Sequence, residues 1–192
     1  MTRTSMTVMT VALMALVLPL RAQTGLYVGA QVTGASLTYK DAADKLDFGS
    51  GFGVHAGLTL GSTFGVLVNY DKNTLGSSGG DTDLGQWDVL GRLGFMALGP
   101  VKTYLTGGMT GRVAQSPSYG GGVGDYKFSG MNPTGGAAAQ VFITSKLALD
   151  GSVLWTFGKF SDTRNGSLDP GRVSATGSRV SLGASWYLLG GK

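Results

Sequence analysis

The side chain with the widest chemical repertoire is His55, the only histidine among 192 residues. A hydrolytic site built on it would need a nucleophile and an orienting acid nearby. Ser152 and Asp150 are of these types, but they belong to a segment predicted to lie far around the fold. We therefore interpret His55 as a structural residue, hydrogen-bonded to Asn69, which is opposite it in the predicted strand pairing.

Other sequence features give no cofactor or metal site. The glycine runs at 76–80 and 119–124 neither follow a strand nor open a helix, so we interpret them as loops. Eight Asp residues fall in predicted loops without the spacing of a calcium loop. Cysteine is absent, which excludes disulfides and thiolate metal sites. The basic residues are scattered, so the sequence predicts no nucleic-acid partner.

Composition favours β-structure. Glycine occurs 34 times, charged residues make up only 14%, and all eleven acids are Asp, with no Glu. A helical protein would rarely lack Glu, which is a good helix former. Residues 1–22 combine Arg3 with an apolar run from Val8 to Leu20, which predicts a cleaved signal peptide. Residues 23–192 are then one domain, and they contain no apolar run as long as a membrane-spanning helix.

Apolar residues alternate with small or polar ones along eight segments of the domain. This period of two predicts β-strands with one apolar face. The segments are 26–39, 48–60, 64–72, 84–98, 101–113, 128–143, 147–160 and 173–188. Pro133 predicts a bulge or a later strand start in the sixth segment. Leu37 and Tyr39 break the alternation of the first segment. This predicts either a bulge or, for a strand that crosses a membrane, an early exit from it.

The connections between the segments alternate in length. Tight turns are predicted at 61–63, 99–101 and 144–146, and long polar loops at 40–47, 73–83, 114–127 and 161–172. Each tight turn needs an odd number of residues if the apolar residues on its two sides are to share a face. The pattern therefore predicts an all-β fold, an eight-stranded antiparallel up-and-down barrel.

Charged residues within the strands decide which face is inside. Asp71, Asp88, Arg92, Arg112, Asp150 and Arg179 all fall on the polar face. A charge that faces hydrocarbon at the bilayer centre costs about 2–4 kcal/mol, whereas one inside the barrel can be paired. This favours a transmembrane barrel over a soluble barrel with an apolar interior. The predicted lumen residues are His55, Asn69, Asp71, Asp88, Arg92, Arg112, Gln140, Asp150 and Arg179.

The predicted turns also give specific pairings. A three-residue turn at 99–101 places Asp88 opposite Arg112, so we expect an ion pair between them. The turn at 144–146 places Asp150 opposite Gln140. Arg92 and Arg179 then have no neighbouring acid. Trp186 and Tyr187 end the last strand near the short turns, where we expect their rings to lie at the membrane interface.

The predicted leader, the eight alternating strands, the short turns, the long loops and the aromatic last strand, "VSLGASWYLLGGK", resemble a known group. They are similar to the small outer-membrane barrels of Gram-negative bacteria, of the OmpX, OmpA-barrel and opacity-protein type. The resemblance implies a monomer in contact with outer-membrane lipid and lipopolysaccharide. It also implies a last strand read by the barrel-assembly machinery.

The resemblance implies a structural or surface-interaction role through the long loops, with no enzyme activity. Two alternatives stay open. One is a narrow pore for small solutes, although the interior of an eight-stranded barrel is just filled by side chains. The other is a lipid-modifying enzyme, because the outer-membrane barrel enzymes use His with Ser.

Overall fold

A computed structural model describes residues 24–39, 48–61, 63–76, 81–116, 126–160, 162–164 and 173–191. The predicted signal peptide, residues 1–22, lies outside these ranges. So do most residues of the four predicted long loops. In the described part of the chain, no helix is long and apolar enough to cross a membrane.

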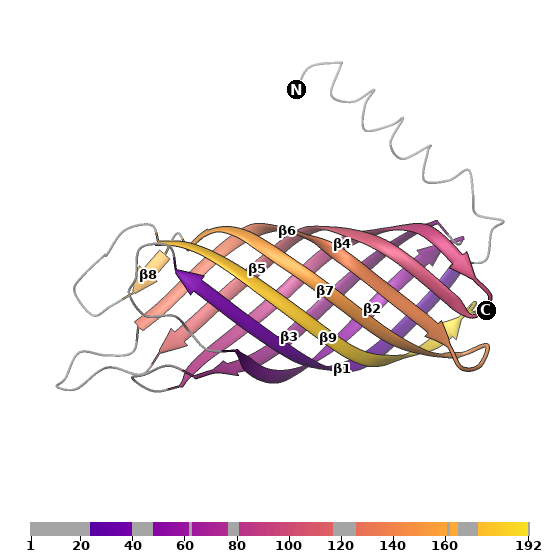
Figure 1. The fold of residues 1–192 in the computed structure, drawn as a ribbon, viewed down its shortest axis with the longest axis horizontal. Coiled ribbons are helices and arrows are strands. Elements are labelled where there is room, and N and C mark those ends of the chain that lie inside the picture. The colour runs from indigo at the N-terminus through magenta and orange to yellow at the C-terminus, as the bar shows by residue number, and fades with distance from the viewer. Residues whose placement is uncertain are drawn as a thin grey trace, which may run out of the picture.

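The predicted fold is confirmed: eight long antiparallel strands close into a barrel (Figure 1). Consecutive strands pair from β1 to β7, and β9 closes the barrel by pairing with β7 and β1. Closure pairs each of the eight long strands on both sides in the described part of the chain, whereas an open edge in lipid would cost several kcal/mol for each backbone group. The strands are β1 (Thr24–Tyr39), β2 (Gly49–Leu60), β3 (Phe64–Leu75), β4 (Thr82–Leu98), β5 (Val101–Ser116), β6 (Tyr126–Phe142), β7 (Leu147–Phe160) and β9 (Val173–Leu189).

The alternation of the sequence sets the two faces of the wall, as predicted. Along β3, Val66 and Val68 are exposed on the outside, whereas Asn69 and Asp71 are buried inside. Exposed large apolar residues occur on every long strand, which is the pattern of a wall that faces lipid. The polar face therefore lines the lumen.

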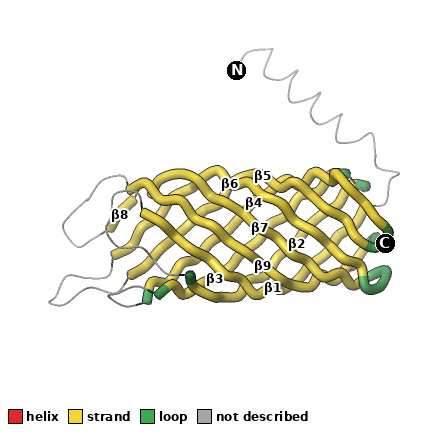
Figure 2. Tube along the Cα trace, in the orientation of Figure 1, coloured by secondary structure: helices red, strands yellow, loops and turns green. Residues whose placement is uncertain are grey.

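The two ends of the barrel differ. The short turns lie at one end, and the strands reach further toward the long loops than predicted (Figure 2). β3 continues to Leu75 and β4 begins at Thr82, so the connection predicted at 73–83 is shorter. β5 and β6 likewise extend into the connection predicted at 114–127. A short strand, β8 (Asp162–Arg164), pairs with β6 beyond the end of β7.

The predicted turn at 99–101 is wrong in length, and this changes the register of β4 with β5. Leu98 pairs with Val101, so the turn has two residues, and Gly99 adopts a φ of 57°. A bulge then inserts Phe95 into β4. The two turn residues and the bulge residue together preserve the odd count, so the faces of β5 and of β4 up to Gly94 stay as predicted. Beyond the bulge, however, the partners on β5 shift by two residues.

Two other predicted irregularities differ from the structure. β6 runs through Pro133 from Tyr126, so Pro133 is not the strand start. Near Pro133, β6 pairs with β7 only as far as Thr134, and it pairs with β8 from Ser129. Between these two points the segment leading from β7 to β8 has one residue more than the facing stretch of β6. In β1 there is no bulge near Leu37: the register with β9 runs unbroken to Tyr39, and Leu37 points into the lumen.

Candidate functional site in the barrel lumen

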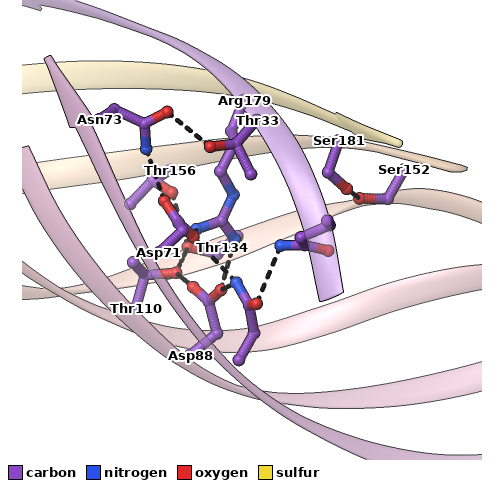
Figure 3. A network of polar contacts seen from close by, with 12 residues as sticks. Thr33, Asp71, Asn73, Asp88, Thr110, Thr134, Ser152, Thr156, Arg179 and Ser181 are labelled. Atoms are coloured by element: carbon purple, nitrogen blue, oxygen red, sulfur yellow. Dashed lines mark hydrogen bonds and ion pairs between the residues drawn. The ribbon is translucent and has the colours of Figure 1, made fainter. Parts of the chain in front are cut away.

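The centre of the lumen holds an arginine between two aspartates (Figure 3). Arg179 extends from β9, and its Nη1 donates to Asp71 Oδ1 on β3 while its Nη2 donates to Asp88 Oδ2 on β4. The side chain of Arg179 is 5% exposed, and both aspartate side chains are fully buried. One guanidinium thus joins carboxylates from two neighbouring strands across the barrel, a charge-assisted pairing in a water-poor interior.

Neutral donors satisfy the rest of this cluster, which we call the central polar layer. Asn69 Nδ2 donates to Asp71 Oδ1 and to Asp88 Oδ2, at 2.9 and 2.8 Å. Asn73 Nδ2 donates to Asp71 Oδ2 at 2.7 Å, and Thr110 Oγ1 donates to Asp88 Oδ1 at 2.5 Å. Every carboxylate oxygen of the pair is therefore hydrogen-bonded, as burial of two charges requires.

The predicted ion pair of Asp88 with Arg112 is wrong. Because the bulge shifts the register, Asp88 lies opposite Thr110, and Arg112 lies opposite Gln86. Arg112 Nη2 donates to the carbonyl oxygen of Ala175 at 3.1 Å, and the guanidinium lies 5.0 Å from the centroid of the Phe160 ring. The expectation that Arg179 has no acid nearby is also wrong, because its partners come from across the lumen.

His55 lies opposite Asn69 as predicted, but its hydrogen bond goes elsewhere. Its Nε2 is 2.8 Å from Ser185 Oγ on β9. To reach β9 the imidazole crosses over Gly29 of β1, where a Cβ would overlap the ring. Asp150 also comes closer than predicted, since its Oδ2 is 3.9 Å from the same Nε2. Ser152 is not part of this group, because its hydroxyl pairs with that of Ser181 at 2.7 Å.

The geometry around His55 does not match a hydrolytic triad. In such a triad the serine and the acid bind different nitrogens of the ring. Here Ser185 and Asp150 both approach Nε2, and Nδ1 is buried without a hydrogen-bond partner. This arrangement supports the interpretation of His55 as a structural lumen residue.

Gln140 and Arg92 organise the lumen on the side of the short turns. Gln140 is opposite Asp150 as predicted, and its Nε2 donates to Asp150 Oδ1 at 2.6 Å. Its Oε1 accepts from the hydroxyls of Tyr104 and Tyr187, at 3.1 and 3.0 Å. Arg92 Nη1 donates to the hydroxyl of Tyr27 at 3.0 Å. Gln140 thus ties β5, β6, β7 and β9 together, and Arg92 joins β4 to β1.

Trp186 and Tyr187 face opposite sides of the wall. Trp186 is 50% exposed on the outside, whereas Tyr187 is 2% exposed and lies in the lumen. The interface role predicted for Tyr187 is therefore wrong, because adjacent residues of a strand cannot share a face. Its ring packs against those of Tyr27 and Phe142 instead, with centroids 5.0 and 5.2 Å apart.

Apolar side chains occupy the lumen on both sides of the central polar layer. The loop-side apolar layer comes from strand ends that adjoin the long loops: Ala35, Leu37, Leu75, Leu84, Ala114, Phe160 and Ala175. The turn-side apolar cluster contains Tyr27, Leu67, Leu90, Phe142, Ala148, Leu154 and Tyr187. In the described lumen the central polar layer thus lies between two groups of apolar residues. Arg112 reaches the loop-side group and Arg92 reaches the turn-side group.

A comparison with protein families identifies the architecture. Residues 5–186 match the family model described as "Outer membrane protein beta-barrel domain". The chain belongs to this family. It is therefore an outer-membrane β-barrel protein, as the sequence predicted. A search of curated proteins gave no match.

Solved structures show the same fold. Neisserial surface protein A is 17% identical, with a TM-score of 0.64 over 84% of this chain and 96% of that one. The attachment invasion locus protein Ail of Yersinia pestis, in complex with the heparin analogue sucrose octasulfate, is 16% identical, with a TM-score of 0.59 over 86% and 99%. OprG of Pseudomonas aeruginosa is 11% identical, with a TM-score of 0.59 over 88% and 97%.

Several residues that complete this family member's lumen were not among those predicted. Asn73 was outside the predicted third strand, and Thr110 was two residues away from the predicted partner of Asp88. Both residues stand at positions of the alternating pattern that face the lumen, and this pattern could have indicated them. Ser185 had the same parity, but nothing local indicates that His55 reaches it. No group of three or more His, Cys, Asp or Glu among the described residues could hold a metal ion.

Proposed function

We propose that this protein serves as a structural or surface-interaction barrel, with a closed lumen and with its contacts made through the long loops. The observation that carries the proposal is the layered filling of the lumen. Leu37, Leu75 and Phe160 are fully buried in the loop-side apolar layer, above a fully satisfied charge cluster. Passage of a solute would require both levels to move.

A narrow pore is the alternative that this filling argues against. An ion that passes the centre would have to separate Arg179 from Asp71 and Asp88. Breaking such a buried pair costs about 3–5 kcal/mol. It would also have to pass the loop-side apolar layer, where Leu37, Leu75 and Phe160 cannot replace its hydration. An enzyme is disfavoured by the geometry at His55, which lacks an acid on Nδ1.

Conductance measurements test the closed lumen. We expect the purified protein, inserted in planar bilayers in KCl, to give no discrete conductance steps. A large general porin in the same bilayers serves as the positive control for insertion. Reproducible steps from the wild-type protein that scale with salt concentration would contradict the closed lumen and favour the pore.

The charge of the long loops limits the partners they suit. The predicted loops carry eight Asp residues and five basic ones, which gives them a net charge of −3. The five basic residues are Lys40, Lys45, Lys127, Arg164 and Arg172. Ail has been crystallised with a heparin analogue, but a polyanion needs an excess of basic residues. The loops of this chain therefore suit a neutral or cationic partner better than a sulfated one.

Proteolysis of intact cells tests which end faces outward. Exposed loop tips are preferred sites of cleavage, so we expect added trypsin to cut after Lys40, Lys45, Arg164 or Arg172. Lys102 and Lys146, at the short-turn end, should be cut only after the outer membrane is permeabilised. Mass spectrometry of the fragments identifies the sites. Cleavage after Lys102 or Lys146 in intact cells would mean that the topology is inverted.

A further inference from the structure

Asp150 is the one acid of the described lumen that no arginine or lysine contacts. Asp71 and Asp88 share the guanidinium of Arg179. Asp150 Oδ1 accepts from the amide of Gln140 at 2.6 Å, but its Oδ2 is buried without a hydrogen-bond partner among the described residues. A buried carboxylate with one unpaired oxygen is costly, because it has lost its water without gaining a full set of donors.

His55 is the basic side chain in contact with this carboxylate. Its Nε2 lies 3.9 Å from Asp150 Oδ2, and the two side chains are 3% and 9% exposed. The same Nε2 is 2.8 Å from Ser185 Oγ, so a neutral ring protonated at Nδ1 accepts there from the serine hydroxyl. A proton added at Nε2 would give the unpaired carboxylate oxygen both a hydrogen-bond donor and a positive charge.

Glycines on the two intervening strands leave the space between His55 and Asp150 open. His55 belongs to β2 and Asp150 to β7, and β1 and β9 lie between them. Gly29 of β1 is the partner of His55, and Gly183 of β9 is the partner of Asp150. A Cβ on Gly29 would lie 2.4 Å from His55 Nε2. The imidazole therefore crosses over β1 toward β7 only because no side chain of β1 blocks it.

The other charges around the imidazole act in both directions. Tyr27 of β1 packs edge to face against His55, with ring centroids 6.1 Å apart, and it accepts from Arg92 of β4. Burial and the positive charge of Arg92 oppose a charge on His55, whereas the carboxylate of Asp150 favours it. The central polar layer, which includes Asn69 opposite His55, adds one net negative charge. The remaining titratable side chains on the turn side of the described lumen are Lys102, Tyr104 and Tyr187.

From this contact we propose that His55 and Asp150 form a buried proton-binding switch, which goes beyond the proposed function. Without the added proton, the imidazole bonds to Ser185 of β9 and the carboxylate keeps an unpaired oxygen. A proton taken from solvent binds Nε2, and the imidazolium then donates from Nε2 to Asp150 Oδ2. The resulting ion pair joins β2 to β7, which are not neighbours in the sheet. Acid thus adds a tie across the lumen that strand pairing along the wall cannot supply.

Nuclear magnetic resonance of the imidazole tests the switch directly. His55 is the only histidine of the chain, so the protein, purified without a histidine tag and folded in lipid bicelles, gives a single labelled imidazole. Titration from about pH 8 to about pH 4 covers the range in which histidines of folded proteins take up a proton. We expect one proton to bind, with both ring nitrogens protonated at the acid end. The dipolar coupling between Nε2 and the carboxylate carbon of labelled Asp should strengthen there.

A matched pair of variants tests the role of the carboxylate. Asp150→Asn removes the negative charge and keeps the size of the side chain. We expect it to lower the affinity of His55 for a proton by about tenfold or more, because a carboxylate this close favours the charged form of its neighbour. Asp83→Asn is the control: it makes the same change at an exposed residue whose Oδ2 lies 2.8 Å from Lys72 Nζ. In this variant His55 should titrate as in the wild type.

Urea titration gives a second readout whose sign follows from linkage. Asp150 strengthens proton binding by folded His55, so the stability that it contributes through the pair is present in acid and is lost as the pH rises. We expect Asp150→Asn to unfold at lower urea than the wild type at the acid end, and the difference to shrink toward the alkaline end. A carboxylate with a merely structural role would give a difference that does not change with pH. If Asp150→Asn does not fold, the coupling between Nε2 and the carboxylate in the wild type decides alone.

Several results would overturn the proposal. These are an imidazole that stays neutral at the acid end, a proton that binds the carboxylate of Asp150 instead, an Nε2 coupling that does not change with pH, an unchanged titration in Asp150→Asn, or an equal loss in Asp83→Asn. None of these readouts depends on conductance or on the loops. A conducting lumen would therefore refute the proposed function and leave the switch standing, and a failed titration would leave the closed lumen standing.

Discussion

Replacing Arg179 with Met should lower the free energy of unfolding by about 3–5 kcal/mol, because it leaves two buried carboxylates without their cation. Asp71 and Asp88 would keep their amide and hydroxyl donors, but two negative charges would then face each other in the lumen. Urea titration of the protein folded in lipid vesicles, followed by tryptophan fluorescence and gel mobility, measures the change.

Two further variants show that the loss comes from the buried charges. Arg179→Met combined with Asp71→Asn and Asp88→Asn should recover part of the stability, because the carboxylates are neutralised along with their partner. Lys72→Met is the matched control. It breaks the exposed pair with Asp83, whose atoms are 2.8 Å apart, and should change stability by no more than about 1 kcal/mol. A loss in Arg179→Met as small as in this control would contradict the role of the central polar layer.

The fold could be predicted because lipid imposes a strict pattern on a barrel wall. Every second residue must face hydrocarbon, so a charge such as Asp88 fixes the face of its whole strand. The alternation is kept although the turn at 99–101 is one residue shorter than predicted. The bulge at Phe95 adds one residue, so the number of unpaired residues between β4 and β5 is still odd.

The contacts within the lumen could not be predicted in the same way. A bulge changes the partner of every residue beyond it, and nothing in the sequence around Phe95 marks one. Arg179 meets Asp71 and Asp88 across the interior, not along a ladder, so no pairing rule connects them. His55 reaches Ser185 only because Gly29 leaves the space between them open. Such contacts depend on how the closed barrel is filled.

The two neighbouring glycines of β5 at 107 and 108 should respond in opposite directions to replacement by Ala. Gly108 faces the lumen, where a Cβ would lie 2.9 Å from Leu90 Cα and 3.1 Å from Val89 C. These are backbone atoms of the adjacent strand, so they cannot rotate away. We expect Gly108→Ala to lower the free energy of unfolding by about 1–3 kcal/mol through overpacking.

Gly107 faces the outside, and the nearest atom to a Cβ there would be Thr134 O at 3.9 Å. Gly107→Ala therefore meets no obstacle, and it restricts the unfolded chain, so it should raise the free energy of unfolding by about 0.5–1 kcal/mol. Because the two residues are neighbours on β5, the two variants compare the same depth in the membrane and the same surrounding lipid. Urea titrations of the two, run side by side with the wild type, give the comparison. Equal effects of the two replacements would show that the inner wall of β5 is not packed against β4 as closely as the structure indicates.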